Sequence, residues 1–470
     1  MRMLSSEINK FRKIVGNKNV ITDKNDMQKY LKEWRGVYTG VAGAIVKPKS
    51  TKEVSNILKF AYRKNISCIP QGGNTGLVGG QIPFNRDHIV ISLERLNKIR
   101  EINPTDQSVT VEAGLILSDL QKKCDENNLI FPLSLASEGS CSLGGNIASN
   151  AGGVAVLYYG NTRELVMGLE VVLSDGSIIN NLKTLIKDNT GYSIKDLFVG
   201  SEGTLGVITA ATLKVFPKPK NIYTALLSVN SPKQSIEILN YIRNNLSIPL
   251  TAFELMNNFS IELVNKHMDK ASIPIEKFKW LILVEFSSIE VSKNEKDKIE
   301  NLLNEILHQN LAKDIFISQS LKQAEDMWYI RESISEAQKK EGGSIKNDIS
   351  IPIKDISKFI NNAEKISKEV IPGSRSVIFG HIGDGNIHFN ISQPIKSDKD
   401  KFLKKDKKLR KKINDLTIEL NGSISAEHGI GLTKKADLKK YMKKDVELFK
   451  LIKKSLDPKN IMNPGKIIDI

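Results

Sequence analysis

The chain has few cysteines and no long apolar runs. Its 470 residues include three cysteines, Cys68, Cys124 and Cys141, whose spacing matches neither a disulfide framework nor a metal site. Such cysteine usage indicates a reducing compartment. No apolar run approaches the roughly 18 residues that cross a bilayer, and the first residues lack the apolar segment of a secretory signal. These absences predict a cytoplasmic protein without a transmembrane segment.

Two nucleotide-binding fingerprints are also absent. G-x-G-x-x-G does not occur, and G-x-x-x-x-G-K-[ST] fails because Gly465-Lys466 is followed by Ile467. If the chain binds a nucleotide, neither a Rossmann turn nor a P-loop holds it.

Positive charge is abundant, and the net charge of +16 comes mostly from lysine. Much of it lies in residues 396–413, "KSDKDKFLKKDKKLRKKI". At helical spacing this stretch is a solvated face with Ile and Leu turned inward, or a docking surface for an acidic partner. A nucleic-acid patch would combine Arg with exposed aromatics, whereas this stretch has one Arg and one Phe.

Glycine gathers in three segments. Residues 70–81, "PQGGNTGLVGGQ", hold five glycines directly after the apolar "ISCIP". The segment is either a phosphate cradle of exposed backbone N–H groups or a mobile surface loop. Residues 137–153 and 187–209 are similarly rich in Gly, Ser, Asn and Thr. Three such segments in one domain suit a long, polyphosphate-containing ligand wrapped by main chain.

The pattern of apolar residues predicts an α+β first half. Strands are expected at 44–48, 67–70, 88–93, 108–114, 169–179 and 206–216, and the stretch 169–179 contains an Asp175-Gly176 turn. A capping box at Ser50-x-x-Glu53 precedes a helix expected at 54–65. This half ends at Pro217-Lys218-Pro219, which is typical of a domain boundary.

The second half alternates helices and strands. Helices are expected at 231–246, 294–310, 324–340 and 355–370, and strands at 280–286, 314–320, 347–352 and 376–381. This order predicts helices packed on one antiparallel sheet.

Three of the six histidines lie in two nearby motifs. "VIFGHIGDGNIHFNI" predicts a hairpin in which Ile382 pairs with Ile387 and His381 lies opposite His388, with Cβ atoms roughly 4.5–5.5 Å apart. Two such imidazoles either bind one metal, with Asn390 on the same face, or form ordinary hydrogen bonds in a partly buried sheet. In "SAEHGIG", Glu427 can complete a His₂Glu metal site, and His428 beside it can act as a base.

Six segments together carry a family resemblance: "PQGGNTGLVGG", "GSCSLGGNIASNAGG", "KDNTGYSIKDLFVGSEGTLGVIT", "GHIGDGNIHFN", "SAEHGIG" and "DPKNIMNPGK". In this order, from about residue 38 to the C-terminus, they resemble the motifs of the FAD-linked D-2-hydroxyacid dehydrogenases, of the vanillyl-alcohol-oxidase superfamily. The resemblance implies an α+β fold in which a two-part FAD-binding domain is joined by a ferredoxin-like, antiparallel-sheet substrate cap. The implied organisation is a helical segment at 1–37, the FAD-binding domain at 38–219, the cap at 220–420, and a segment at 421–470 that returns to the FAD domain.

The resemblance also implies the cofactor site. The loop at 70–81 would hold the FAD pyrophosphate, and the loop has Gln71 and Asn74 where covalently flavinylated relatives place a histidine, so FAD is expected to be non-covalent. The implied FAD-binding residues are Pro70, Gln71, Gly72, Gly73, Asn74, Thr75, Gly76, Ser137, Gly139, Ser140, Gly144, Gly145, Asn146, Asn150, Gly152, Gly153, Glu202, Gly203, Gly206, Val207, Ile208 and Asn463.

For the metal, the resemblance implies His381, His388 and Glu427 as ligands, with His428 as the catalytic base at the substrate. Zinc, manganese and iron all suit this ligand set, with zinc or manganese favoured. The implied reaction is oxidation of a D-2-hydroxy acid to a 2-oxo acid. Because no second redox motif is present, the electrons are expected to pass to a separate acceptor, such as an electron-transfer flavoprotein or a quinone-linked protein.

The substrate is suggested by three further residues. Arg331 and Ser335 are four apart on an expected helix, and Lys346 follows on a strand. The two cations are either solvated surface charges or ligands of a second substrate carboxylate. The second interpretation follows from the spacing, which resembles that of the hydroxyglutarate dehydrogenases. Asn390 and His428 are also expected at the substrate. Those relatives have Thr where this chain has Ser335, so D-malate or a longer diacid remains an alternative to D-2-hydroxyglutarate.

Other functions also fit parts of the sequence. D-lactate or glycolate dehydrogenase fits the same scaffold, and a basic nucleic-acid-binding protein is the rival from another class. A homodimer is the expected assembly if the chain associates with itself.

Overall fold

The structure of the chain is a computed structural model that describes residues 3–268, 275, 278–290 and 293–470. Its contacts divide the chain into two units. The first comprises Met1–Gly152, Gly160–Lys218 and Glu427–Ile470, and the second comprises Gly153–Tyr159 and Pro219–Ala426. Among the helices of the described residues, none has the length and apolar character that a bilayer span requires.

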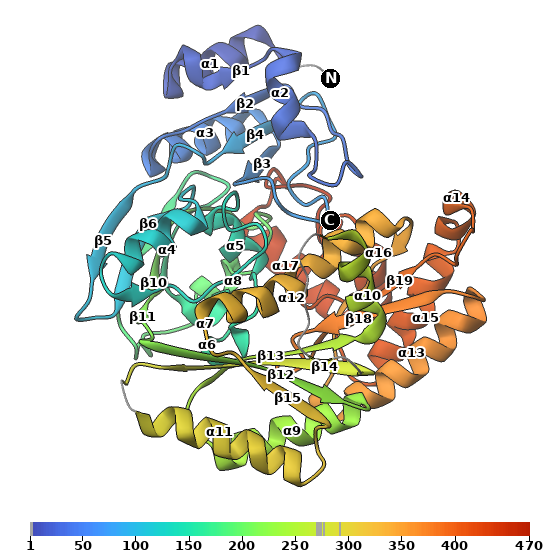
Figure 1. The fold of residues 1–470 in the computed structure, drawn as a ribbon. Helices are drawn as coiled ribbons and strands as arrows, with labels where there is room; N and C mark the ends of the chain where they lie inside the picture. The colour runs from blue at the N-terminus through green and yellow to red at the C-terminus, as the bar shows by residue number, and fades with distance from the viewer. Residues whose placement is uncertain (1–2, 269–274, 276–277, 291–292) are drawn as a thin grey trace. The chain divides into compact units, whose positions relative to one another are not determined.

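The first unit opens with a small sheet in the order β1-β2-β4-β3 (Figure 1). Strand β4 (Ile89–Ser92) pairs in parallel with β2 (Ala44–Val46) and β3 (Cys68–Gln71), while β1 (Val20–Ile21) pairs antiparallel with β2. Every residue of β2 and β4 is buried, as expected of strands covered on both faces. The helices of this part are α1 (Ser5–Val15), α2 (Lys24–Leu31) and α3 (Thr51–Lys64), with a short 3₁₀ turn η1 (Asn17–Asn19).

The capping box predicted before α3 forms only in part. The Ser50 hydroxyl accepts a hydrogen bond from the Glu53 N–H at 3.2 Å. The Glu53 carboxylate, however, accepts from the N–H of Lys49 rather than from that of Ser50. Ser50 is therefore the N-cap that the motif implies, and only the reciprocal bond to Glu53 comes from one residue earlier.

A five-stranded antiparallel sheet follows, in the order β5-β6-β10-β8-β9. Its strands are β5 (Ile99–Asn103), β6 (Ser108–Glu112), β8 (Val166–Val172), β9 (Ile178–Asn181) and β10 (Val207–Lys214). The remaining elements of this part are α4 (Leu117–Asp125), α5 (Leu143–Ser149), α7 (Thr162–Leu165), α8 (Lys195–Phe198) and the strand pair β7 (Leu129–Ile130) and β11 (Phe216–Pro217).

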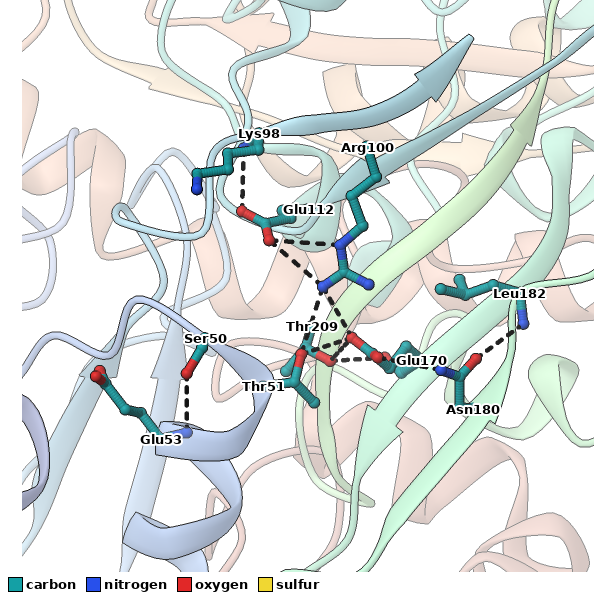
Figure 2. A network of polar contacts seen from close by, with 10 residues as sticks. All are labelled: Ser50, Thr51, Glu53, Lys98, Arg100, Glu112, Glu170, Asn180, Leu182 and Thr209. Atoms are coloured by element: carbon teal, nitrogen blue, oxygen red, sulfur yellow. Dashed lines mark hydrogen bonds and ion pairs between the residues drawn. The ribbon is translucent and has the colours of Figure 1, made fainter. Parts of the chain in front are cut away.

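A network of polar contacts joins α3 to this sheet (Figure 2). The Glu170 carboxylate on β8 accepts hydrogen bonds from Thr51 Oγ1 at 2.6 Å, from Thr209 Oγ1 at 2.9 Å and from the Arg100 guanidinium at 3.1 Å. Arg100 also contacts Glu112 at 3.4 Å. Because Thr51 is the first residue of α3, the network fixes the start of the helix against the sheet.

The last part of the chain, which contains α16 (Lys435–Tyr441) and α17 (Lys443–Leu456), packs within the first unit. Next to β3, the Cys68 N–H donates to the Ile461 carbonyl and the Asn463 N–H donates to the Cys68 carbonyl. The buried Lys453 ammonium donates to the Thr204 carbonyl at 2.7 Å and to Asp457 at 2.5 Å. Residues separated by hundreds of positions in the sequence thus build one domain.

The second unit is built on one eight-stranded sheet in the order β15-β12-β14-β13-β18-β19-β16, with β17 also paired to β19. All of its strand pairs are antiparallel. The strands are β12 (Asn221–Val229), β13 (Leu250–Asn257), β14 (Trp280–Ser288), β15 (Asp314–Ile317), β16 (Ser344–Ile345), β17 (Asp348–Ser350), β18 (Arg375–Gly380) and β19 (Asn386–Ser392).

Helices cover both faces of this sheet (Figure 1). One apolar core joins a face of the sheet to α9 (Pro232–Asn245), α11 (Lys293–His308), α13 (Ile356–Val370) and α15 (Asp406–Glu419), and a second core joins the other face to α10 (Asn258–His267) and α12 (Leu321–Glu341). The short helices are α6 (Val156–Tyr159), α14 (Lys399–Leu403) and the 3₁₀ turn η2 (Ile353–Asp355). The predicted antiparallel sheet with packed helices is confirmed, although β12, β13 and α10 were not predicted.

The basic stretch 396–413 forms α14 and most of α15. Its apolar residues Phe402, Leu409 and Ile413 are buried in the core of the second unit, whereas most of its lysines are exposed. This is the pattern of the solvated face that the sequence predicted.

Candidate functional site

The first unit contains a pocket at the glycine-rich segments. It encloses about 890 Å³, counting the solvent at its mouth. Of the residues predicted to bind FAD, the pocket is lined by Pro70, Gln71, Gly72, Gly73, Asn74, Thr75, Gly76, Gly144, Gly145, Asn146, Glu202, Gly203, Gly206 and Ile208. Three segments that are far apart in the sequence therefore share one wall.

Glycine is required where two of these segments touch. A Cβ on Gly72 would lie 2.0 Å from Ser142 Oγ, and a Cβ on Gly73 would lie 2.0 Å from the Ser140 carbonyl oxygen. Only residues without a side chain allow the loop after β3 to lie against the segment that leads into α5.

Polar atoms of the pocket residues also lack protein partners. Among the described residues, the buried Gln71 Oε1, Asn74 Oδ1 and Ser142 Oγ have no hydrogen-bond partner. Buried polar atoms are rarely left unpaired, and such atoms beside a pocket point to a polar ligand. The residues present therefore fit a ligand that offers hydrogen-bonding groups along its length, as a dinucleotide does.

Some predicted FAD residues support the pocket without lining it. Asn463 donates from Nδ2 to the Gly80 carbonyl at 3.0 Å and to the Glu202 carbonyl at 2.8 Å, which ties the C-terminal segment to two walls. The predicted residues that do not appear in the lining are Ser137, Gly139, Ser140, Asn150, Gly152, Gly153, Val207 and Asn463. Sequence reasoning missed seven lining residues: Val78, Gly80, Gln81, Leu93, Ser142, Ala148 and Ser149. All but Leu93 lie in the glycine-rich segments 70–81 and 137–153, and this position was the only available signal.

Glu202 connects the pocket to the "AEHGIG" segment. Its carboxylate accepts hydrogen bonds from the N–H of Ile430 at 2.7 Å and from the N–H of Gly431 at 2.9 Å. Burial raises the pKa of Glu202 to about 7, although these two N–H groups act in the opposite direction. His428 lines the same pocket, so the turn that follows this histidine is held by a pocket residue.

In the second unit, the two histidines of the hairpin lie close together. The ring centroids of His381 and His388 are 5.9 Å apart, and the ring planes are inclined by 78°. The predicted register is wrong, however: His388 pairs with Phe379 across the strands, and His381 lies in the turn. The chain turns at Gly380, which has a φ of +153°, one residue before His381. Only glycine fits at this position, because a Cβ would lie 2.6 Å from the Asn386 carbonyl oxygen. The turn, rather than a strand pair, brings the imidazoles together.

Carboxylates lie next to both imidazoles. The Glu254 carboxylate on β13 is 2.5 Å from His381 Nδ1, and the Asp348 carboxylate on β17 is 3.9 Å from His388 Nδ1. A carboxylate beside Nδ1 is the arrangement that commonly orients a metal-binding histidine.

Comparison with known proteins identifies the family. Residues 42–181 match the FAD binding domain model, and residues 218–467 match the model of the C-terminal domain of FAD linked oxidases. The chain is 36% identical to mitochondrial D-2-hydroxyglutarate dehydrogenase of Arabidopsis thaliana over 99% of this chain and 82% of that protein. It is 34% identical to D-2-hydroxyglutarate dehydrogenase of Stutzerimonas stutzeri over 98% of both chains.

The chain belongs to the FAD-linked D-2-hydroxyacid dehydrogenase family. The predicted family and FAD as cofactor are thereby confirmed. The predicted α+β fold of the vanillyl-alcohol-oxidase type is also confirmed by solved structures. p-Cresol methylhydroxylase matches with a TM-score of 0.77 at 16% identity over 99% of this chain and 96% of that chain. An alkyldihydroxyacetonephosphate synthase matches with a TM-score of 0.73 at 19% identity over 99% of this chain and 85% of that chain.

The structure of this family member also places the residues predicted at the substrate. Arg331, on α12, is buried and donates from Nε to Glu254 Oε2 at 2.7 Å. It is therefore not a solvated surface charge, and its positive charge already has a carboxylate partner. Ser335 is exposed one turn further along the same helix. Lys346 lies between β16 and β17, where its carbonyl accepts a hydrogen bond from Arg410 at 2.7 Å.

Asn390 is buried on β19. Its Nδ2 donates to Gln338 Oε1 at 3.1 Å, and its Oδ1 accepts from the Asn347 N–H at 3.2 Å. These bonds hold Asn390 in the sheet beside the segment that carries Lys346. Glu254, which contacts both His381 and Arg331, lies in "LTAFELMN", where no turn or motif drew attention to it.

Proposed function

We propose that this dehydrogenase oxidises D-2-hydroxyglutarate to 2-oxoglutarate. The observation that carries the proposal is the full-length similarity to D-2-hydroxyglutarate dehydrogenases from a plant, a fish and a bacterium. Arg331, Ser335 and Lys346 have the spacing expected for binding the second carboxylate of this substrate. The alternative on the same scaffold is D-lactate or glycolate oxidation, for which these cations have no second carboxylate to bind.

The pocket of the first unit would hold FAD through the main chain of its three glycine-rich segments and through Gln71, Asn74 and Ser142. FAD, when bound, accepts the hydride from C2 of the hydroxy acid. Because residues 70–81 contain no histidine, FAD is held non-covalently in this proposal. Acid precipitation should release all the flavin into the supernatant, and flavin retained by the denatured chain would contradict the assignment.

His381, His388 and Glu427 would hold a divalent metal, zinc or manganese by ligand type. The proposal is supported by the two adjacent imidazoles and by the position of Glu427 along the chain. Ser423 pairs with Ser350, the last residue of β17, and Glu427 follows four residues later. A divalent metal, when bound, lowers the pKa of a coordinated hydroxyl group.

His428 would act as the base that removes the proton of the C2 hydroxyl group. The proposal is supported by the position of His428 in the lining of the cofactor pocket. It is also supported by the N–H groups of Ile430 and Gly431, which donate hydrogen bonds to the pocket residue Glu202. General bases of this kind contribute about 10²–10⁴-fold to a rate. Arg331, Ser335, Lys346 and Asn390 would bind and orient the substrate.

The reduced protein would pass its electrons to a separate acceptor, either an electron-transfer flavoprotein or a quinone-linked protein. A relative from Saccharomyces cerevisiae, 33% identical over 99% of this chain, is named D-2-hydroxyglutarate–pyruvate transhydrogenase, which makes a 2-oxo acid the alternative acceptor. Reoxidation of the substrate-reduced protein by pyruvate would favour this alternative.

The cytoplasmic location and the homodimer stay predictions. The plant and animal relatives are named mitochondrial, so cell fractionation should examine both compartments. Light scattering of the purified protein would test the dimer, and a monomer mass would contradict it.

The substrate can be tested by dye reduction with a panel of D-2-hydroxyglutarate, D-malate, D-lactate and glycolate. The proposal predicts the highest kcat/KM for D-2-hydroxyglutarate. A higher kcat/KM for D-lactate or glycolate would instead support the alternative function.

The metal can be tested by removing it. Chelator treatment, or His388→Ala, should abolish turnover and metal content but leave the flavin spectrum largely intact, because none of the three proposed ligands lines the cofactor pocket. Full activity of the exhaustively metal-free protein would refute the ligand assignment.

A further inference from the structure

One buried carboxylate in the second unit contacts two of the residues discussed above. Glu254, on β13, has no solvent exposure. Its Oε1 lies 2.5 Å from His381 Nδ1, and its Oε2 accepts a hydrogen bond from Arg331 Nε at 2.7 Å. The two oxygens of one side chain therefore bind a proposed metal ligand and a proposed substrate ligand.

The contact with His381 determines which ring nitrogen is available. An imidazole that donates its Nδ1 proton to a carboxylate carries the lone pair on Nε2, which is the form that binds a metal. The carboxylate also makes the imidazole a stronger ligand and holds the ring in one orientation.

The contact with Arg331 determines which donors remain. Among the described residues, the guanidinium donates from Nε to Glu254, and its two terminal nitrogens have no protein hydrogen-bond partner. The Phe379 ring lies 4.8 Å from the Arg331 guanidinium carbon and limits its rotation. The terminal nitrogens are thus oriented together and can bind a carboxylate as a fork.

We propose that Glu254 is a positioning residue that holds the metal ligand His381 and the substrate ligand Arg331 in one fixed arrangement. The inference rests on the proposed function. It assigns a role in the reaction to a residue that lies outside every recognisable sequence motif.

Glu254→Gln tests the inference. The glutamine amide oxygen can accept a hydrogen bond from either His381 or Arg331, but not from both. The amide NH₂ group then faces the remaining donor. The variant should bind zinc or manganese about 10–100-fold more weakly, the loss expected when the outer partner of a metal ligand is removed. The KM for D-2-hydroxyglutarate should rise by more than the KM for D-lactate, because only D-2-hydroxyglutarate has a second carboxylate that Arg331 could bind.

A matched control is available on the neighbouring strand. Glu285, on β14, is a partly buried carboxylate that accepts from Trp328 Nε1 at 2.9 Å and from Thr251 Oγ1 at 3.1 Å. Glu285→Gln should therefore change thermal stability without changing metal affinity or the ratio of the two KM values.

The measurement is a metal titration of the FAD-loaded protein in competition with a chromophoric chelator, combined with steady-state kinetics on both substrates. Wild-type metal affinity and an unchanged KM ratio in Glu254→Gln would overturn the inference, as would equal losses in Glu285→Gln. If Glu254→Gln does not fold, Glu254→Asp, which keeps the charge but is one methylene shorter, is measured in the same way. A wild-type protein that binds no metal and does not oxidise D-2-hydroxyglutarate would contradict the proposed function itself.

Discussion

At the scale of single residues, the proposed choice of substrate rests on Arg331 and Lys346. The charge of Arg331 is already paired with Glu254. The distal carboxylate of the substrate would therefore bind to the terminal nitrogens of an arginine whose charge is partly compensated. Lys346 is the second cation that the proposed function assigns to this carboxylate. The segment that carries it is fixed through the hydrogen bond from Arg410 to the Lys346 carbonyl.

Lys346→Met should lower kcat/KM for D-2-hydroxyglutarate by roughly thirty-fold or more, because losing one partner of a desolvated charge pair costs about 2–5 kcal/mol. The same change should spare activity on D-lactate. Lys354, exposed in η2, provides the control, and Lys354→Met should leave both activities unchanged. Equal losses on the two substrates in Lys346→Met would show that Lys346 has a structural role.

The histidine pair shows what the sequence can and cannot predict about a residue. The presence of His381 and His388 in one hairpin followed from two apolar runs joined by the Gly-Asp-Gly-Asn turn. The register did not, because the bend at Gly380 depends on the close approach of the Asn386 carbonyl, which a sequence pattern does not encode. Glu254 was missed for the same reason: its role depends on partners that are 77 and 127 positions away.

At the scale of elements, the network around Glu170 joins α3 to the five-stranded sheet (Figure 2). Burial would raise the pKa of Glu170, but hydrogen bonds from Thr51, Arg100 and Thr209 outweigh burial and hold this pKa below its ordinary value of 4.5. A carboxyl group whose pKa is lower in the folded state stabilises the fold above its unfolded pKa, and this stabilisation is lost as the pH falls through the folded pKa.

Glu170→Gln should therefore lower the free energy of unfolding by about 2 kcal/mol at pH 7, as expected for hydrogen bonds to a charged group. The difference from wild type should shrink below about pH 4.5, where the wild-type carboxyl group also becomes protonated. Urea unfolding at several pH values measures both effects. Glu126, an exposed carboxylate in the same unit, provides the control, because Glu126→Gln should leave stability unchanged. A loss that does not depend on pH would contradict this account.

Most elements with a clear apolar period were predictable, including the hairpin of β8 and β9 at the Asp175-Gly176 turn and the helices α9, α11, α12 and α13. Strand β13 was not, because "LTAFELMN" leads directly into α10 without Gly or Pro. The only local signal between them is the N-cap Asn257, whose side chain accepts a hydrogen bond from the Ser260 N–H. The glycine-rich segments were recognisable as functional and were expected to wrap one ligand, but which of their residues line the pocket is a property of the fold.

At the scale of the whole chain, family membership rests on motifs that run in order from the first glycine loop to the C-terminus. The return of the last residues to the first unit depends on pairs such as Lys453 with the Thr204 carbonyl and Lys466 with the carbonyls of Gly79 and Ile82. Local sequence patterns do not predict such long-range contacts. The resemblance implied them because it covers nearly the whole chain.

The most direct test of the central claim is anaerobic reduction of the bound flavin by substrate, followed at the flavin absorbance band. Mixing the FAD-loaded protein with D-2-hydroxyglutarate should bleach the band in a single turnover, whereas L-2-hydroxyglutarate should leave the band unchanged. D-lactate should bleach it at least thirty-fold more slowly, because about 2 kcal/mol or more of binding energy is lost with the second carboxylate. A band that D-2-hydroxyglutarate does not bleach, or that both enantiomers bleach at the same rate, would contradict the claim that this protein is a D-2-hydroxyglutarate dehydrogenase.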